Sequence, residues 1–173
     1  MMSSAQGGIS PSAGNFGTGL KSDPAGPKGP PKSLLLVLPD DEDYHRMHPI
    51  AGRSSWTIHR SHTCREAVAF LSEHPVSVVI TDREPSRDDW KKLLGAARHM
   101  PFAPKPKLII AYRFAESHAA AQLLRRGAYQ ILAKPFHEGE VARALGFAWA
   151  QCKRDWELGQ RTSSLTKATA AGS

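Results

Sequence analysis

Charged residues follow three of the apolar runs in this sequence, at the point where each run ends. Asp82 ends the run VVITD, Lys134 follows YQILA, and the acids DDED at 40–43 follow LLLVL. A carboxylate held at such a place can act as a nucleophile toward phosphorus and form an aspartyl phosphate. An acidic cluster can bind Mg²⁺, and a lysine can neutralise charge on a transferred phosphoryl group. In the alternative interpretation, Asp82 begins a turn and the acids stabilise the N-terminus of a helix.

The strands that would position these residues are visible as short apolar runs. Such runs lie at residues 34–38, 76–80, 108–111 and 129–133, bounded by polar residues or proline. Strands that are apolar on both faces belong to a buried parallel sheet. A weaker, alternating run at residues 55–59 fits an edge strand.

Amphipathic stretches between the runs predict helices. Apolar residues at helical spacing cover residues 63–74, 87–99, 116–126 and 138–158, and Gly127 is placed to end the third of these helices. A further helix at 41–51 contains Pro49, which should shorten or kink it. The alternation predicts an α/β fold, a three-layer sandwich with helices on both faces of a parallel sheet. Functional groups of such sheets gather at the carboxyl ends of the strands.

The two ends of the chain differ in composition from this core. Residues 1–32 are rich in Gly, Pro and Ser, and residues 159–173 are rich in Ser, Thr and Ala. Segments of this kind bury too little apolar surface to offset their ordering entropy, so both are predicted to be disordered tails around a domain at 33–158. The chain carries a net charge of +7, and five of its basic residues lie in these tails. This mildly basic balance permits weak contact with nucleic acid without predicting it as the main function.

Several classes of protein are disfavoured by what the sequence lacks. Cys64 and Cys152 form no disulfide framework or zinc motif, and the eight histidines show no ligand spacing for a metal. No apolar run is long enough for a membrane span, and no signal peptide is evident, so the cytoplasm is the expected compartment. The absence of a glycine-rich loop after the first strand argues against a nucleotide or flavin cofactor.

Two motifs give the sequence a resemblance to a known family. VVITD, ending at Asp82, and GAYQILAKPF, at 127–136, make residues 34–152 resemble the receiver domain of two-component response regulators. The resemblance implies a flavodoxin-like, doubly wound (βα)5 sheet with strand order 2-1-3-4-5. It also implies that Asp82 accepts a phosphoryl group from a histidine kinase, that Lys134 contacts this group, and that the Lys134-Pro135 peptide bond is cis, as is usual in that family.

The sequence also departs from the family pattern at three places. The two acids expected directly after the first strand fall on Leu38 and Pro39, so that Asp40 and Asp41, with Asp82, become the candidate Mg²⁺ ligands. The switch hydroxyl expected after the fourth strand falls on Ala111. The aromatic switch residue of the fifth strand falls on Ile131. The resemblance is therefore to an atypical, stand-alone receiver.

Two functions of different classes follow from this pattern. The first is phosphoryl acceptance on Asp82 within a phosphorelay, with output by protein contact and no enzymatic activity beyond slow self-dephosphorylation. The second is a pseudo-receiver that binds a partner protein without phosphorylation. In either case a homodimer could form through the fourth helix, fifth strand and fifth helix. The candidate contact residues for this dimer are Arg125, Arg126, Arg143 and Trp149.

Overall fold

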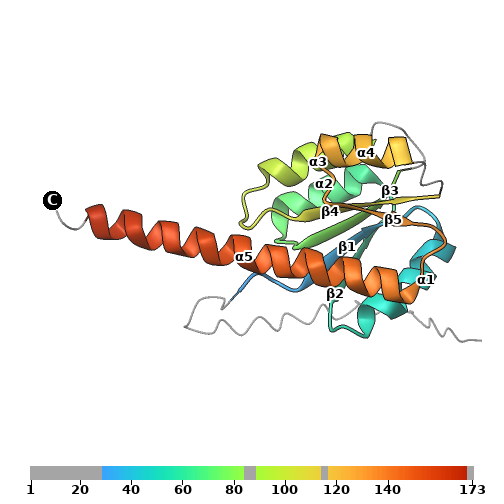
Figure 1. The fold of residues 1–173 in the computed structure, drawn as a ribbon, viewed down its shortest axis with the longest axis horizontal. Coiled ribbons are helices and arrows are strands. Elements are labelled where there is room, and N and C mark those ends of the chain that lie inside the picture. The colour runs from blue at the N-terminus through green and yellow to red at the C-terminus, as the bar shows by residue number, and fades with distance from the viewer. Residues whose placement is uncertain (1–28, 84–88, 114–116, 171–173) are drawn as a thin grey trace, which may run out of the picture.

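Five parallel strands form a single sheet in the order β2-β1-β3-β4-β5 (Figure 1). The structure is a computed structural model that describes residues 29–83, 89–113 and 117–170. The strands are β1 (Ser33–Val37), β2 (Thr57–Ser61), β3 (Val78–Asp82), β4 (Lys107–Tyr112) and β5 (Gln130–Ala133). Both the parallel sheet and the strand order implied by the resemblance are confirmed. The edge strand β2 begins two residues later than the alternation at 55–59 predicted.

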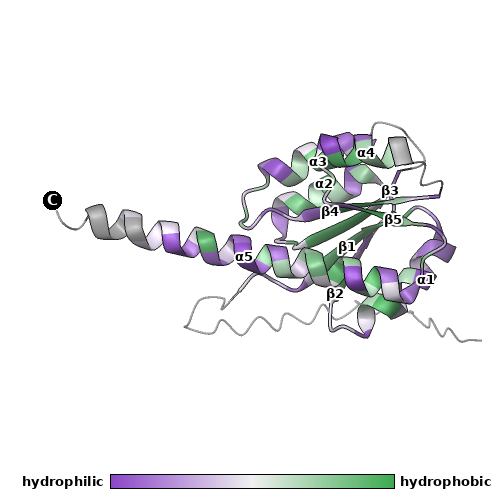
Figure 2. Ribbon diagram, in the orientation of Figure 1, coloured by the Kyte–Doolittle hydropathy of each residue, from purple (hydrophilic) through white to green (hydrophobic). Residues whose placement is uncertain are grey.

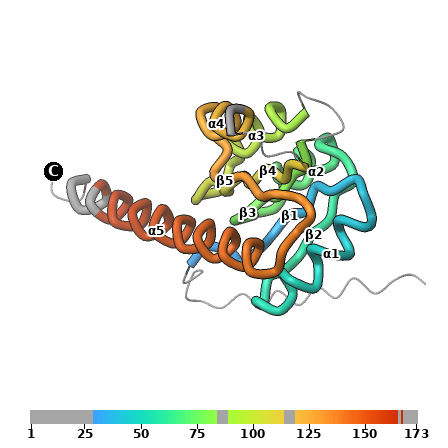
Figure 3. Tube along the Cα trace, turned by 45° about the vertical axis from the view of Figure 1, so that its right-hand side comes forward, coloured from blue at the N-terminus to red at the C-terminus, as the bar shows by residue number. Residues whose placement is uncertain are grey.

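Helices cover both faces of the sheet and complete the three layers. One face carries α1 (Asp41–Gly52) and α5 (Glu138–Ala170), and the other carries α2 (Cys64–Glu73), α3 (Asp89–His99) and α4 (Ser117–Arg126) (Figures 1 and 3). Side chains of β1 alternate between the two layers. Leu34 and Leu36 pack in the cluster under α1 and α5, whereas Leu35 and Val37 pack in the cluster under α2, α3 and α4. This alternation also decides which strand-end side chains share a face.

Local features of the sequence explain where α2 begins and where α4 ends. The Thr63 hydroxyl accepts a hydrogen bond from the Glu66 amide at 3.2 Å, and the Glu66 carboxylate accepts one from the His62 amide. This reciprocal arrangement satisfies amides at the start of α2 that would otherwise lack partners. Gly127, at φ +112°, follows α4 as predicted, and a Cβ at this position would lie 1.9 Å from the Arg98 guanidinium. The backbone conformation is therefore the reason for glycine here, since the flexible Arg98 side chain could move away from a Cβ.

Two expectations about the elements were wrong. α1 continues through Pro49 to Gly52, so the proline does not end the helix. It loses only its own bond to the His45 carbonyl, and the Arg53 amide still donates to the Pro49 carbonyl. α5 continues to Ala170, so residues 159–170 are helical where a tail was predicted. The packed segment 138–158 already provides the helix nucleus, and each further residue adds one hydrogen bond. Hydroxyl groups in this part donate to backbone carbonyls four residues earlier in the helix. The Ser163 hydroxyl, for example, donates to the Gly159 carbonyl.

The N-terminal boundary of the domain also lies earlier than predicted. Pro30 is buried, the Ser77 hydroxyl donates to the Pro31 carbonyl, and the Lys32 ammonium lies 5.6 Å from the centre of the Trp56 ring. Residues 1–28 and 171–173, predicted as tails, lie outside the described residues, as do the first residues of the predicted helices 87–99 and 116–126. In the described ranges, no helix is both long and apolar enough to span a membrane. Hydrophilic residues alternate with apolar ones along the coloured part of α5 (Figure 2).

Candidate functional site at the carboxyl ends of the strands

Three charged side chains meet at the carboxyl edge of the sheet, on the face covered by α1 and α5. Val78 and Ile80 of β3 pack in the cluster on this face, so strand alternation places Asp82 on the same side. Leu132 of β5 packs there too, which places Lys134 on that side for the same reason. Asp43 comes from the first turn of α1.

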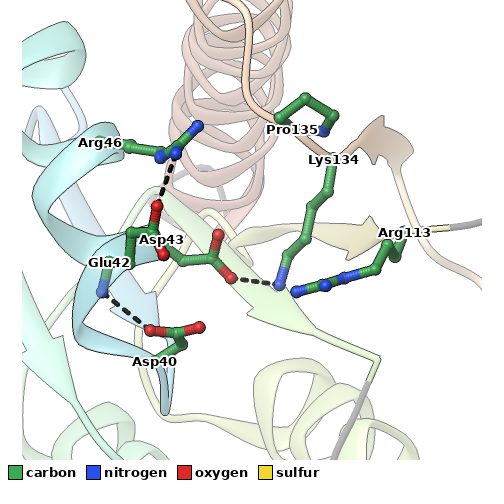
Figure 4. Close-up of a pocket in the computed structure, with 7 residues that line it drawn as sticks. All are labelled: Asp40, Glu42, Asp43, Arg46, Arg113, Lys134 and Pro135. Atoms are coloured by element: carbon green, nitrogen blue, oxygen red, sulfur yellow. Dashed lines mark hydrogen bonds and ion pairs between the residues drawn. The ribbon is translucent and has the colours of Figure 1, made fainter.

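The Lys134 ammonium joins the two carboxylates. It donates to Asp43 Oδ2 at 2.5 Å and also to Asp82 Oδ2 (Figure 4 shows the bond to Asp43). The side chain of Lys134 is 5% exposed and those of Asp43 and Asp82 are each 13% exposed. Burial by itself would lower the pKa of Lys134, but its hydrogen bonds to Asp43 and Asp82 outweigh this effect and raise the pKa above the ordinary value. Lys134 is therefore a cation at neutral pH.

The meeting of Asp82 and Lys134 agrees with the sequence-based prediction, whereas the predicted partners from the acidic run do not join them. The Asp40 carboxylate accepts from the Glu42 amide at 2.8 Å and caps α1. Asp41 is 72% exposed and pairs with Arg60, whose guanidinium lowers the pKa of that carboxyl. These two acids thus serve the helix start, which was the alternative interpretation of the run.

Asp43 is the site residue that sequence reasoning missed. A signal for it was present in the helical spacing, because Asp43 lies four residues before Met47, which is fully buried against the sheet. An acid on the buried stripe of α1 must face the sheet, whereas the acids at 40 and 41 lie outside that stripe. Leu38, at the position where the family has an acid, is buried in the core. Asp43 therefore supplies from the helix a carboxylate that the strand end lacks.

The carboxylates of Asp43 and Asp82 are the side-chain oxygens in this site that could bind a divalent cation. No cluster of three or more His, Cys, Asp or Glu side chains suited to a metal occurs within the described ranges. Two converging carboxylates nonetheless fit Mg²⁺, which binds through one or two carboxylates and keeps several waters. The residues that would hold the ion are thus Asp82, as predicted, and Asp43, in place of Asp40 and Asp41.

The two switch positions lie beside the site without the groups that the family uses. Ala111 of β4 is the register partner of Asp82 and is completely buried, so only a methyl group faces the acid from β4. The guanidinium carbon of Arg83 lies over the Tyr112 ring, 4.3 Å from the ring centre. Ile131 packs against the other core cluster, under α2, α3 and α4. A hydroxyl donor at position 111 is therefore absent, and position 131 is an ordinary packing residue.

The rim of the site is formed by charged residues from α1 and by the segments that follow β4 and β5. Figure 4 shows Asp40, Glu42, Asp43 and Arg46 on one side, and Arg113, Lys134 and Pro135 on the other. The Arg46 guanidinium pairs with Glu42 at 2.5 Å. The Lys134-Pro135 peptide bond is cis, as the resemblance implied.

The predicted contact surface on α4, β5 and α5 needs one correction. Trp149 is not an exposed anchor, because it is half-buried with its ring 5.7 Å from that of Trp56 in an edge-to-face arrangement. Arg125, Arg126 and Arg143 are exposed. Phe147 and Leu124, at 58% and 46% exposure, are the large apolar side chains on this side. The homodimer remains a prediction, with Phe147 in place of Trp149.

Comparison with known proteins identifies the fold. No family model and no curated protein sequence matches the chain. A Chloroflexus aurantiacus protein described as a response regulator has 21% identity over 69% of this chain and 98% of its own, with a TM-score of 0.61. A sensor histidine kinase receiver domain from Pseudomonas aeruginosa, solved with magnesium in its active-site cleft, has 18% identity, coverage of 69% and 97%, and a TM-score of 0.60.

A chemotaxis response regulator of Vibrio cholerae gives a similar result, with 16% identity, coverage of 67% of this chain and 97% of its own, and a TM-score of 0.60. These structures align over nearly their whole length, and the strand order of the sheet is the one that the sequence resemblance implied. At such identities the agreement concerns the backbone rather than the chemistry. About two thirds of the chain, including the sheet that carries the strand-end site, thus has the fold of a response-regulator receiver domain.

Proposed function

We propose that this protein acts in two-component signalling by accepting a phosphoryl group on Asp82 from a histidine kinase. The observation that carries the proposal is the contact of the Lys134 ammonium with the Asp82 carboxylate at the carboxyl edge of the sheet. A nucleophilic carboxylate next to a fixed cation is the arrangement that phosphoryl transfer needs. The receiver fold supports the same interpretation, and signalling in the cytoplasm through protein contact follows from it.

Each charged side chain has a distinct part in this reaction. A carboxylate oxygen of Asp82 attacks the phosphorus, the bond from phosphorus to the imidazole nitrogen of the donor breaks, and the imidazole leaves with the electron pair. Lys134 lies where it can stabilise the negative charge on the phosphoryl oxygens. Asp43 keeps Lys134 charged and holds its ammonium in place. Mg²⁺, when bound by Asp43 and Asp82, would supply further positive charge to the transferred group.

A second candidate function is favoured by one observation on the same site. Ala111 faces Asp82 with a methyl group, so no hydroxyl at this position can link phosphorylation to a movement of the loop after β4. A protein with this substitution could bind a partner through the receiver scaffold in one fixed conformation. In that case the Asp43–Lys134–Asp82 contacts would stabilise the fold only.

Incubation with acetyl phosphate and Mg²⁺, followed by intact-mass measurement, separates the two functions. Phosphoryl acceptance predicts a mass increase of one phosphoryl group that is absent in Asp82→Asn. Asp41→Asn is the matched control, because Asp41 is exposed and lies outside the group of three side chains. Wild type without any mass increase, or Asp82→Asn with an unchanged increase, would contradict phosphoryl acceptance and favour the binding module.

A further inference from the structure

Arg113 lies beside Lys134 at the carboxyl edge of the sheet. Tyr112 of β4 is the register partner of Ala133 of β5, so Arg113 and Lys134 are the next residues of the two neighbouring chain segments. Both side chains line the same pocket above Asp43, and the close-up shows the guanidinium directed toward the ammonium (Figure 4). The pocket thus contains two cations from adjacent segments.

The Arg113 guanidinium is exposed and has no hydrogen-bond, ion-pair or ring partner in the described part of the chain. Arg46 and Arg83 each have one such partner, although the buried Nη1 of Arg83 lacks a hydrogen bond. Arg46 pairs with Glu42 at 2.5 Å, and Arg83 lies 4.3 Å from the centre of the Tyr112 ring. A guanidinium carries five donors in a planar fork that suits phosphate oxygens. Because Arg113 is exposed, water satisfies these donors in the free protein, and an anion that binds beside Lys134 can replace that water.

The charges of the site indicate which anion this is. Asp43, Asp82 and Lys134 together have a formal charge of −1, and the charge of Lys134 is already shared between two carboxylates. When Asp82 carries a phosphoryl group, the formal charge of the same group of residues becomes −2. Ala111 offers no donor to the added oxygens. Mg²⁺ would offset this charge but would supply no hydrogen-bond donor on the β4 side of the group. Arg113 is a described side chain next to Lys134 that can supply one.

We propose that Arg113 is the second cationic contact of the phosphoryl group and takes the place of the missing hydroxyl at position 111. This inference rests on the proposed function and names the residue that holds the product. Asp82 forms the new bond to phosphorus, the bond from phosphorus to the donor breaks, and the leaving group departs with its electron pair. Arg113 then donates N–H bonds to the phosphoryl oxygens, which favours both the transfer and the retention of the group.

Titration with inorganic phosphate, followed by NMR, tests this contact without requiring phosphorylation. The background is Asp82→Asn, which removes the carboxylate charge that repels a free anion. Adding Arg113→Ala should weaken phosphate binding about tenfold, since a charge-assisted bidentate contact is lost. Arg113→Lys should retain part of the affinity, and Arg143→Ala, an exposed arginine on α5, should retain all of it. Equal affinity for the Arg113→Ala and Arg143→Ala proteins, or no phosphate binding in the background itself, would overturn the proposal.

The rate of phosphorylation by acetyl phosphate provides the second measurement. Arg113→Ala, in an otherwise wild-type chain, should be phosphorylated about tenfold more slowly than wild type and should unfold at the same temperature. An unchanged rate would overturn the role of Arg113. If wild type itself is not phosphorylated, the proposed function fails, whereas the phosphate titration still decides whether Arg113 contacts an anion.

Discussion

Lys134 and Asp43 are separated by 91 positions in the sequence, yet the ammonium of one donates to the carboxylate of the other at 2.5 Å. The contact joins the segment after β5 to the first turn of α1 across the carboxyl edge of the sheet. It holds Lys134 as a cation beside Asp82 and fixes the position of its ammonium. The fold thereby positions a charge at the place where phosphoryl transfer would need it.

Asp43→Asn tests the importance of this contact for stability. The amide keeps an acceptor oxygen but loses the charge. We therefore expect the free energy of unfolding to fall by about 1 kcal/mol, which is less than the full contribution of a hydrogen bond between charged groups. Urea unfolding, monitored by tryptophan fluorescence, measures the change. Asp41→Asn should have a smaller effect, because Asp41 is exposed to solvent. An equal or larger loss in Asp41→Asn would show that Asp43 has no special role.

The raised pKa of Lys134 predicts how its contribution to stability depends on pH. Its ordinary pKa is 10.5, and the folded value lies above this. The contribution is therefore fully present below pH 10.5 and is lost as the pH rises through the folded pKa. Lys134→Met should lower the free energy of unfolding by about 3 kcal/mol near neutral pH, because it leaves two buried carboxylates without their cation.

Urea unfolding of wild type and Lys134→Met between about pH 8 and pH 12 checks this prediction. Because the other lysines and tyrosines titrate in both proteins, their effect cancels in the difference between the two free energies of unfolding. It should stay constant up to the ordinary pKa and shrink above it. A difference that shrinks at lower pH would mean that the pKa is not raised.

Ala111→Ser would restore a hydroxyl group opposite Asp82. One additional donor to the bound group should increase the affinity for beryllofluoride, a mimic of the phosphoryl group, about tenfold. Ala111→Cys is the matched control, because the thiol is of similar size but a weak donor. Fluorescence titration in the presence of Mg²⁺ measures both. Equal gains in the two variants would point to packing at the fully buried position 111 rather than to a hydrogen bond.

Cys152 should report whether α5 stays packed on the sheet. Its thiol is completely buried and donates to the Ser77 carbonyl at 3.1 Å, and burial raises its pKa to about 11. Since the thiolate is the reactive form, a thiol reagent at about pH 8 should modify Cys152 only after unfolding. Cys64 is half-buried and should react first. Labelling resolved by mass spectrometry, with Cys64→Ser as control, measures the two rates. Equal rates under native conditions would show that α5 separates from the sheet.

Much of the architecture was predictable because it depends on local patterns. Continuous apolar runs and helical spacing identified the βα repeat, and the resemblance carried by VVITD and GAYQILAKPF supplied the strand order. Asp82 and Lys134 could be paired in advance, because the carboxyl ends of all strands of a parallel sheet lie at one edge, and only β4 separates β3 from β5. The length of α5 could not be predicted in the same way, since residues 159–170 contain few apolar residues and their helix continues from a packed segment that precedes them.

The sequence by itself determined that a carboxylate and an ammonium would lie at the same edge of a parallel sheet, because each follows an apolar run and all strands of such a sheet end at one edge. Only the tertiary structure decided which acid of the run 40–43 joins them. Four adjacent carboxylates are chemically alike, and the rotation of α1 on the sheet, set by the burial of Met47, turns Asp43 inward. The same packing leaves Asp40 to cap the helix and Asp41 to face solvent.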